Sequence, residues 1–299
     1  MKIKKSGFWA KYGEDYLFVM PFFLLFFVFT VLPVLVSVLY SFTYFNVLEP
    51  PEFIGLKNYY ELFIEDDIFM VALKNTLLLS LVIGPAGFLL SFVCAWLLNE
   101  FKHALRTVLT VLFYVPAMSA NVFLVWQVIL SNDSYGILNS FLMRLGFITS
   151  PIDWLHNTDY MMPTIILVSI WLSLGTSFLS FIAGLQNVDT TLIEAGAIDG
   201  IRSRWQELYY IILPGMRNQL MFGAVMSITS SFGMGGIITQ LAGYPSTNYA
   251  VHTLVHHLED YGGMRYEMGY ASAIAVVLFG LMIGANSNVQ KMIRKIGGD

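Results

Sequence analysis

Hydroxyl side chains recur at helical spacing inside two long apolar segments. The first row consists of Ser169, Ser173, Thr176, Ser177 and Ser180; the second consists of Ser227, Thr229, Ser230 and Ser231, with Met234 inside the glycine cluster that follows. Residues three and four apart share one face of a helix. Hydroxyls on an apolar wall can bind a neutral solute such as a sugar, which needs hydrogen bonds but no fixed charge. We therefore expect Ser173, Thr176, Ser227, Ser230 and Ser231 to line a path for a neutral solute, with Ser169, Ser177 and Met234 as neighbours.

A structural interpretation of the same rows stays open. Serine, threonine and glycine are common where helices meet inside a membrane, because small residues allow close approach and hydroxyls bond to the neighbouring helix. Each single residue of the two rows fits that interpretation at least as well as the path. Both rows together favour the path.

Three histidines, His252, His256 and His257, lie close together with Glu259. Histidines four apart share a helix face and can hold a metal ion. The sequence offers no second cluster of ligands nearby, so a polar helix at the membrane interface, facing an external protein, is the favoured interpretation. The only cysteine, Cys94, lies within an apolar run, and the sequence therefore offers no disulfide or thiolate metal cluster.

A polar stretch separates the two hydroxyl-bearing segments. It runs from Glu194 to Pro214 and reads EAGAIDGIRSRWQELYYIILP. Thr190 or Thr191 can cap a helix whose first turn holds Glu194, where a negative charge suits the helix dipole. Gly200 can end that helix in a conformation that other residues resist. Pro214 then marks the start of the next spanning helix. A stretch this short between two membrane-crossing segments is typical of a contact site for another protein.

The apolar segments themselves predict an all-α integral membrane protein. The chain has 299 residues, of which 57% are hydrophobic and 12% charged. Six apolar runs each exceed the ~20 residues that a helix needs to cross a bilayer. We place them at residues 17–40, 76–98, 107–130, 161–185, 218–241 and 268–290. The expected organisation is an interfacial segment over 1–16, a membrane domain over 17–290 and a tail over 291–299.

Basic residues predict the orientation. Of the 16 lysines and arginines, all but Lys57, Lys74, Arg144 and Arg265 lie on the side of the termini and of the Glu194 stretch. Cytoplasmic loops are enriched in these residues, which places both termini and that stretch in the cytoplasm. The predicted spans contain no Asp, Glu, Lys, Arg or His, and the chain has no G-x-x-x-x-G-K-[ST] phosphate loop. We therefore expect an energy source outside this chain.

The polar stretch resembles the EAA signature of the membrane subunits of binding-protein-dependent ABC importers. The matching residues are Glu194, Ala195, Asp199, Gly200 and the Ile212-Leu213-Pro214 end. Further matches in order are YVPAMSANVFLVWQVILSNDSYGILNSFLMRLG over 114–146, Asp153-Trp154-Leu155, Trp171, Ala183-Gly184-Leu185-Gln186 and Gly269-Tyr270-Ala271-Ser272-Ala273. The resemblance covers nearly the whole chain and points to the carbohydrate-type permeases of the maltose and glycerol-phosphate kind.

This resemblance implies a type I importer domain with six transmembrane helices and a cytoplasmic coupling helix between helices 4 and 5. In that family the loop, here about 187–216, docks into a cleft on a separate ATPase. The implied coupling residues are Glu194, Ala195, Asp199, Gly200, Arg202 and Pro214. The implied partners are a second, related permease, two ATPase subunits that hold ATP and Mg²⁺, a solute-binding protein outside the cell, and membrane lipid. No cofactor is expected on this chain, and no nucleic acid. The location would be a bacterial or archaeal plasma membrane.

The loop departs from the family pattern at two positions. Gly196 stands where a second alanine is usual, and Ile201 stands where a small residue follows the glycine. One residue is also added between Gly200 and Trp205, which predicts a different rotation of the second half of the loop. Two other classes stay open beside the importer subunit. One is a self-powered carrier, which the absence of intramembrane charge disfavours. The other is an intramembrane enzyme built on the histidines.

Overall fold

The computed structural model describes residues 8–119 and 121–296. Four of its helical stretches are long and apolar enough to cross a membrane: Asp15–Tyr40, Asp67–Asn99, Thr158–Gln186 and Met268–Arg294. Two bent helix pairs, His103–Met118 with Val122–Ile129 and Arg217–Phe232 with Gly235–Ala242, pass the same test together. The described part of the chain therefore has four candidate spans, or six if each bent pair is one span.

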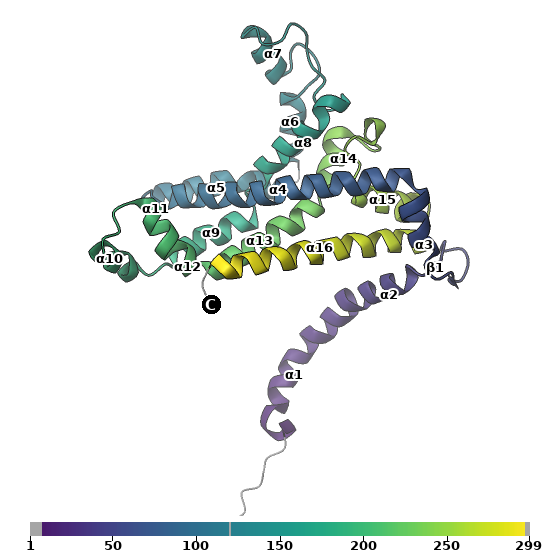
Figure 1. Cartoon of the computed structure of the whole chain (residues 1–299), viewed down its shortest axis with the longest axis horizontal. Coiled ribbons are helices and arrows are strands. Elements are labelled where there is room, and N and C mark those ends of the chain that lie inside the picture. The colour runs from purple at the N-terminus through teal and green to yellow at the C-terminus, as the bar shows by residue number, and fades with distance from the viewer. Residues whose placement is uncertain (1–7, 120, 297–299) are drawn as a thin grey trace, which may run out of the picture. The chain divides into compact units, whose positions relative to one another are not determined.

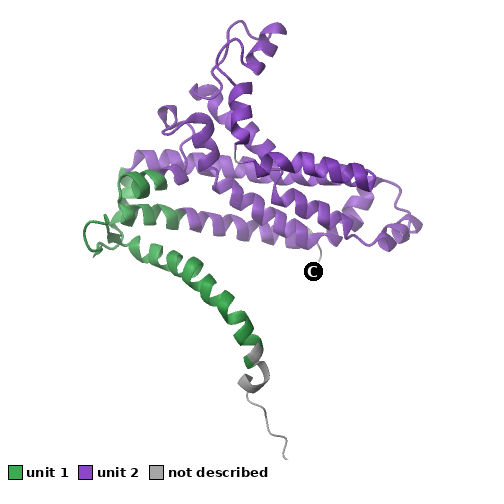
Figure 2. Cartoon of the chain, turned by 180° about the vertical axis from the view of Figure 1, so that it is seen from behind, with its two compact units in different colours: residues 1–65, 258–277 green, residues 66–257, 278–299 purple. Residues whose placement is uncertain are grey.

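The chain divides into two compact units (Figure 2), residues 1–65 with 258–277, and residues 66–257 with 278–299. The first unit contains α1 (Phe8–Phe26), a π-helical turn (Phe27–Val31), α2 (Leu32–Tyr40), β1 (Thr43–Tyr44), β2 (Glu52–Phe53), α3 (Lys57–Tyr60), two further π-helical turns (Glu61–Glu65 and Asp260–Met264) and the start of α16 (Met268–Ile296). β1 pairs with β2 in antiparallel register, Thr43 opposite Phe53. Asn58 Nδ2 donates to the carbonyls of Ser41 and Thr43, which holds α3 against β1.

The second unit contains the elements of the expected loop and hydroxyl rows (Figure 1). Its helices are α4 (Asp67–Asn99), α5 (His103–Met118), α6 (Val122–Ile129), α7 (Ile137–Arg144), α8 (Thr158–Leu172), α9 (Thr176–Gln186), α10 (Thr190–Ile198), α11 (Arg204–Glu207), a π-helical turn (Leu208–Ile212), α12 (Leu213–Gly215), α13 (Arg217–Phe232), α14 (Gly235–Ala242), a 3₁₀ turn (Thr247–Tyr249), most of α15 (Leu254–Glu259) and the rest of α16.

Helices α4, α9 and α13 pack against one another in the middle of this unit. Glycines make the close approach possible. A Cβ on Gly87 of α4 would lie 2.7 Å from the Cβ of Ser173, and a Cβ on Gly223 of α13 would collide with the ring of Phe181. Small residues at helix contacts are the usual way to bring membrane helices together. The aromatic rings of Phe178 and Phe181 are fully buried in this contact, so the three helices share one packed core.

Two of the predicted spans are interrupted. The expected helix over 107–130 bends by 85° between α5 and α6, and the one over 218–241 bends by 45° between α13 and α14. Pro116 removes a backbone donor near the first bend, and Ser119 ends α5 in an extended conformation. Gly233 lies at the second bend with φ −91° and ψ 19°. Each of these two predicted spans is therefore a pair of helices joined by a bend, and the count of six spans stays a prediction.

Several helix boundaries also differ from the predicted ones. α4 begins at Asp67, nine residues before the predicted start, because the Asp66 carboxylate accepts a hydrogen bond from the Phe69 amide at 2.8 Å and caps it. α1 is already helical from Phe8, within the expected interfacial segment. Residues 1–7 of that segment and residues 297–299 of the expected tail lie outside the described residues. The organisation into segments 1–16, 17–290 and 291–299 stays a prediction.

Candidate functional site

The loop predicted to couple begins with a helix, α10, but its cap differs from the prediction. Asp189 is the N-cap, and its carboxylate accepts a hydrogen bond from the Thr191 amide at 2.9 Å. Thr190 is the first helical residue, so neither threonine is the cap. Glu194 consequently lies in the second turn, and the first turn holds no acidic residue. The hydrogen bonds from Thr191 hold the pKa of Asp189 below its ordinary value, which keeps a negative charge at the N-terminus of the helix.

Gly200 ends α10 as predicted. Its φ is +98°, a region that residues with a Cβ rarely adopt. The Ile201 amide donates to the Gly196 carbonyl at 2.9 Å and the Gly200 amide donates to the Ala197 carbonyl at 3.4 Å. This pair of bonds is the Schellman arrangement that satisfies the last carbonyls of a helix. Glu194, Ala195, Asp199, Gly200 and Arg202 are all exposed around this turn.

The two departures of the loop from the family pattern lie against each other. A Cβ on Gly196 would come within 2.6 Å of Ile211 Cδ1 and 3.0 Å of Ile201 Cδ1. Gly196 is buried although its neighbours Ala195 and Ala197 are exposed. The isoleucines therefore occupy the space where the usual alanine would stand, and Gly196 and Ile201 form one packing unit.

The second half of the loop is tied to the end of α4. Ser203 and Gln206 form a reciprocal capping box that starts α11, and Gln206 Oε1 also accepts from the Arg202 amide at 3.0 Å. Arg204 Nη2 lies 2.8 Å from Glu100 Oε2, and the rings of Trp205 and Trp96 lie 5.1 Å apart. Neither contact was predicted from the sequence, because Glu100 and Trp96 precede their partners by more than a hundred positions.

Pro214 does not begin the fifth spanning helix as predicted. It lies at the second position of α12, a single turn that ends at Gly215 and is followed by the C-cap residue Met216. Met216 is fully buried, and the long helix α13 starts only at Arg217. The Arg217 guanidinium donates to the Arg294 carbonyl at 3.0 Å and holds the start of α13 near the end of α16.

Large apolar side chains are exposed along the same loop. Ile198 is 87% exposed and Trp205 71%. Leu192, Tyr209 and Tyr210 are also more than half exposed. In Figure 1, α10 lies with α11 and α12 at the end of the second unit where α4 ends and α5 begins. Exposed apolar and aromatic side chains beside charged ones are typical of a protein interface.

The two hydroxyl rows meet where α9 contacts α13. Ser177 Oγ donates to the Gly223 carbonyl at 3.1 Å and lies 3.2 Å from Ser227 Oγ. Ser231 is buried against Gly84, and its Oγ donates to the carbonyl of Ile228. Ser177 and Ser231 thus take part in contacts between helices, and a role of either in lining a path stays a prediction.

The remaining residues of the predicted path are divided between buried and exposed positions. Ser169 and Met234 are buried, and Ser169 Oγ has no hydrogen-bond partner among the described residues. Ser173 is half-buried, with its Oγ bonded to the Ile170 carbonyl at 2.6 Å. Thr176 and Ser230 are exposed. The lining of a path by these residues stays a prediction, and Thr176 and Ser230 are its most accessible members.

The three histidines are buried, so their side chains are not available to an external protein as the interpretation of a polar helix at the membrane interface expected. His252, His256 and His257 are each no more than 3% exposed. His257 Nε2 lies 2.9 Å from Asp66 Oδ2. The Thr253 amide donates to His256 Nδ1 at 3.1 Å, so the proton of that ring is on Nε2 and points at the Gly235 carbonyl, 3.0 Å away. No group of three potential metal ligands was found among the described residues.

His252 has the fewest hydrogen bonds of the three histidines. Neither of its ring nitrogens has a hydrogen-bond partner within the described ranges. Burial and the neighbouring His256 and His257 lower the pKa of His252 from 6.5 to about 4. Burial also lowers the pKa of His256. The cluster is therefore neutral at His252 and His256 near pH 7 and belongs to the packing of the 242–267 segment.

The pattern of the family "Binding-protein-dependent transport system inner membrane component" matches residues 85–290. The chain is 34% identical over 271 residues to the probable ABC transporter permease protein YesP of Bacillus subtilis, covering 88% of this chain and 84% of that protein. It is 32% identical to the arabinooligosaccharides transport system permease protein AraP of the same organism, covering 92% and 88%.

A solved structure shows the same fold. The chain resembles a chain of a bacterial alginate ABC transporter in complex with an alginate pentasaccharide-bound periplasmic protein, with a TM-score of 0.78, 22% identity and coverage of 98% and 99%. The fold and the family match thus define the class of this chain, which is a mostly helical membrane permease. The chain belongs to the family of binding-protein-dependent ABC importer permeases, and it is a transport subunit rather than an enzyme.

Proposed function

We propose that this chain forms half of the translocation path of an ATP-driven importer for a sugar or oligosaccharide. The observation on which this rests is the loop over 187–216, whose Schellman turn at Gly200 presents exposed charged and apolar side chains together. Relatives of the chain transport arabinooligosaccharides and sn-glycerol-3-phosphate. The two hydroxyl rows consist of uncharged side chains, which favours a neutral solute here.

The proposed assembly contains this chain, a related but different permease, two ATPase subunits and an extracytoplasmic solute-binding protein. The loop is proposed to dock on the ATPase through Glu194, Ala195, Asp199, Gly200 and Arg202 and through exposed Ile198 and Trp205. Its position in the cytoplasm, with both termini, follows from the distribution of basic residues. ATP and Mg²⁺ would be bound by the ATPases.

The contacts of the loop offer a physical route from ATP hydrolysis to the solute. Arg204 and Trp205 join the loop to Glu100 and Trp96 at the end of α4. α4 packs against α9 and α13, on which the hydroxyl rows lie. When the ATPases close and pull two such loops together, α4 would shift as a rigid rod and change the exposure of Thr176 and Ser230.

Uptake by the complete assembly in sealed vesicles tests the proposal. We expect labelled arabinooligosaccharides, the solute of the AraP relative, to accumulate with ATP supplied at the ATPase side and to continue when proton and sodium gradients are collapsed. Glycerol 3-phosphate and an alginate trisaccharide serve as anionic comparisons. Uptake that follows an ion gradient and ignores ATP would instead identify a self-powered carrier and overturn the proposal.

A further inference from the structure

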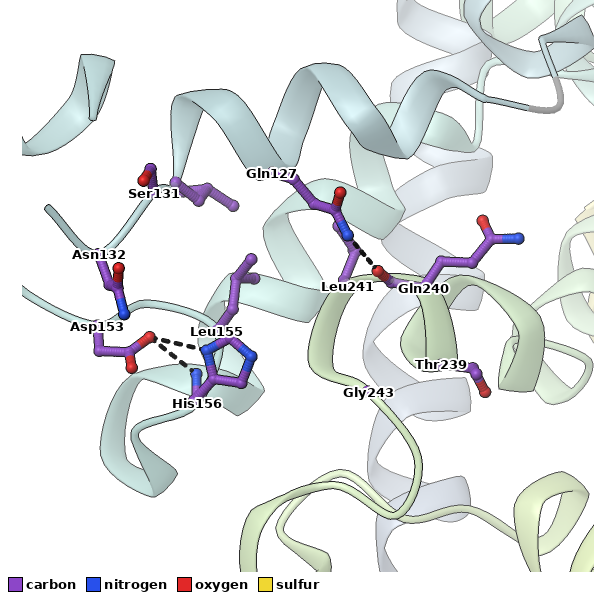
Figure 3. Close-up of a pocket in the computed structure, with 11 residues that line it drawn as sticks. Gln127, Ser131, Asn132, Asp153, Leu155, His156, Thr239, Gln240, Leu241 and Gly243 are labelled. Atoms are coloured by element: carbon purple, nitrogen blue, oxygen red, sulfur yellow. Dashed lines mark hydrogen bonds and ion pairs between the residues drawn. The ribbon is translucent and has the colours of Figure 1, made fainter. Parts of the chain in front are cut away.

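A cavity of about 360 Å³ lies apart from the residues of the predicted path (Figure 3). Its walls are the end of α6, the segments at 131–132 and 153–156, and the end of α14 with Gly243. The volume is within the range of small-molecule sites. Thr239 of its wall lies on α14, which follows α13 and Ser230 after the 45° bend. None of the predicted path residues lines the cavity, so the two are separate and are connected through α13 and α14.

The lining offers the groups that recognise a sugar. Gln127 and Asn132 supply side-chain amides, Ser131 and Thr239 supply hydroxyls, and Asp153 supplies a carboxylate. Amides and hydroxyls both donate and accept, as do the hydroxyls of a sugar ring. Leu130, Leu155 and Leu241 form an apolar part of the same wall, against which the C–H face of a ring can pack. Figure 3 shows the side chains of Asn132 and Asp153 next to each other on one wall of the cavity and the side chain of Gln127 on another wall.

The polar walls are held in place before any ligand binds. The fully buried Asn139 of α7 donates through Nδ2 to the carbonyls of Ser131 and Ile152, at 2.9 Å each. Its Oδ1 accepts from the Ile152 amide and from Trp154 Nε1, at 3.1 and 2.9 Å. One side chain thus joins the two segments that carry Asn132 and Asp153. Gln127 Nε2 donates to the Gln240 carbonyl at 2.7 Å and joins α6 to α14. Such pre-organisation lowers the entropy cost of binding.

The charge of the cavity selects among sugars. None of its lining residues is a lysine or arginine, and Asp153 is the acidic one. The ring and amide of His156 lie 3.1 Å from Asp153 Oδ1. Partial burial acts to raise the pKa of Asp153, but the bonds from His156 outweigh it and keep that pKa below its ordinary value. With the His156 imidazole neutral, Asp153 is the one charged group of the lining and repels an anionic ligand, so a neutral ring is favoured over a uronate or phosphate.

We propose that this cavity is a second carbohydrate site, which holds one neutral sugar unit of an oligosaccharide beside the path. The proposal rests on the proposed transport of sugars by this chain, and it adds where the oligosaccharide is held and which residues select its charge. Gln127, Asn132 and Asp153 bind the ring hydroxyls, and Asp153 disfavours acidic sugars.

Thiol labelling in the complete reconstituted assembly tests this site. Cys94 is the only cysteine of the chain, so Cys94→Ser gives a background in which single cysteines report one position. Asn132→Cys probes the cavity, Ser230→Cys probes the predicted path, and Tyr135→Cys, at a residue 93% exposed outside the cavity, is the matched control. The rate of reaction with a small polar maleimide is measured with and without millimolar arabinotriose or alginate trisaccharide.

We expect arabinotriose to slow labelling at Asn132→Cys at least about fivefold, with Tyr135→Cys unchanged and alginate trisaccharide without effect. Adding Asp153→Asn should allow alginate trisaccharide to protect. Protection at Ser230→Cys without protection at Asn132→Cys overturns the second site and leaves the proposed function standing. Protection by the acidic sugar alone overturns the charge selection. Protection at neither position by either sugar counts against both the site and the transport of sugars.

Discussion

Ile201 Cδ1 lies 3.0 Å from the point that a Cβ on Gly196 would occupy, so these two unusual residues of the loop are a matched pair. The neighbouring Ile211 Cδ1 is closer still, at 2.6 Å. The first prediction follows from this relationship. Gly196→Ala gains about 1 kcal/mol of helix propensity but overpacks a filled space, at a cost of about 1–3 kcal/mol.

We therefore expect Gly196→Ala to loosen the loop, because the clash outweighs the propensity. Tryptic cleavage at the exposed Arg202 and Arg204 should become several-fold faster. Combining it with Ile201→Val and Ile211→Val removes the two methyl groups concerned and should return cleavage to the rate of the double valine variant. No rescue by the valines would show that the three side chains are not coupled.

Gly200 gives the second prediction. Its φ of +98° is unfavourable for any residue with a Cβ, at a cost of about 1–3 kcal/mol. Gly200→Val should weaken binding of the ATPase or raise the ATP hydrolysed per solute transported, while insertion in the membrane is unchanged. Gly280→Ala is a suitable control, because no atom lies within 4 Å of a Cβ there and its φ is not positive. Normal coupling in Gly200→Val would contradict a coupling role for this turn.

The Arg204–Glu100 ion pair gives the third prediction. Its side chains are 62% and 46% exposed, so its loss should change stability by less than about 1 kcal/mol. Glu100→Gln should nevertheless raise the ATP hydrolysed per solute, because the loop would move with less effect on α4. Glu207→Gln, which removes the other partner of Arg204, should leave that ratio unchanged. Equal effects of the two variants would show that the link to α4 is unimportant.

The fourth prediction concerns pH. The pKa of His252 falls from 6.5 when unfolded to about 4 in the folded chain, so the unfolded state binds more protons between these values. Stability from this residue is present above pH 6.5 and is lost as the pH falls toward 4, by about 3 kcal/mol in total. His252→Phe removes the titrating ring, and the drop in unfolding temperature between pH 7.5 and 5 should shrink. An unchanged drop would mean that other groups determine the acid sensitivity.

Asn139 gives the fifth prediction. Asn139→Leu keeps the size of the side chain but leaves the Ile152 amide, Trp154 Nε1 and two carbonyls without their partner. Buried groups left unpaired cost about 1–3 kcal/mol each. We expect faster tryptic cleavage at Arg144 and a red-shifted Trp154 emission. Asn132→Leu, a change at an exposed residue near Asn139 in the sequence, should leave both the cleavage rate at Arg144 and the Trp154 emission unchanged.

The sequence allowed some parts of the fold to be predicted because they depend on local properties. The length of the apolar runs located the spans, and the predicted start of the last one, residue 268, is the first residue of α16. Gly200 was correctly expected to end a helix, since only a glycine tolerates that φ. The cap was missed by one or two positions, because Asp189, Thr190 and Thr191 all have suitable side chains and only the backbone decides among them.

Other parts depend on partners far away in the sequence. Helical periodicity shows that Ser173 and Ser177 belong to one row, but it does not reveal that Ser177 faces Gly223. The contact between His257 and Asp66 was not predicted, because Asp66 precedes His257 by 191 residues. The cavity beside Asn132 and Asp153 was not foreseen at all, since its shape depends on how Asn139 folds the intervening segment.

Long-range pairing of α4 also sets the order of events while the protein is being made. Asn75 Nδ2 is bonded to the carbonyls of Tyr249, Ala250 and His252, and Thr76 Oγ1 to the Leu254 amide, 174–178 residues later. At the usual rate of translation, roughly 10 to 40 s pass between the synthesis of α4 and the synthesis of those partners. During that interval its polar groups need water, lipid headgroups or the insertion machinery as temporary partners. A ribosome that stalls between residues 76 and 249 would therefore leave a membrane helix whose Asn75 amide lacks all three of its carbonyl partners.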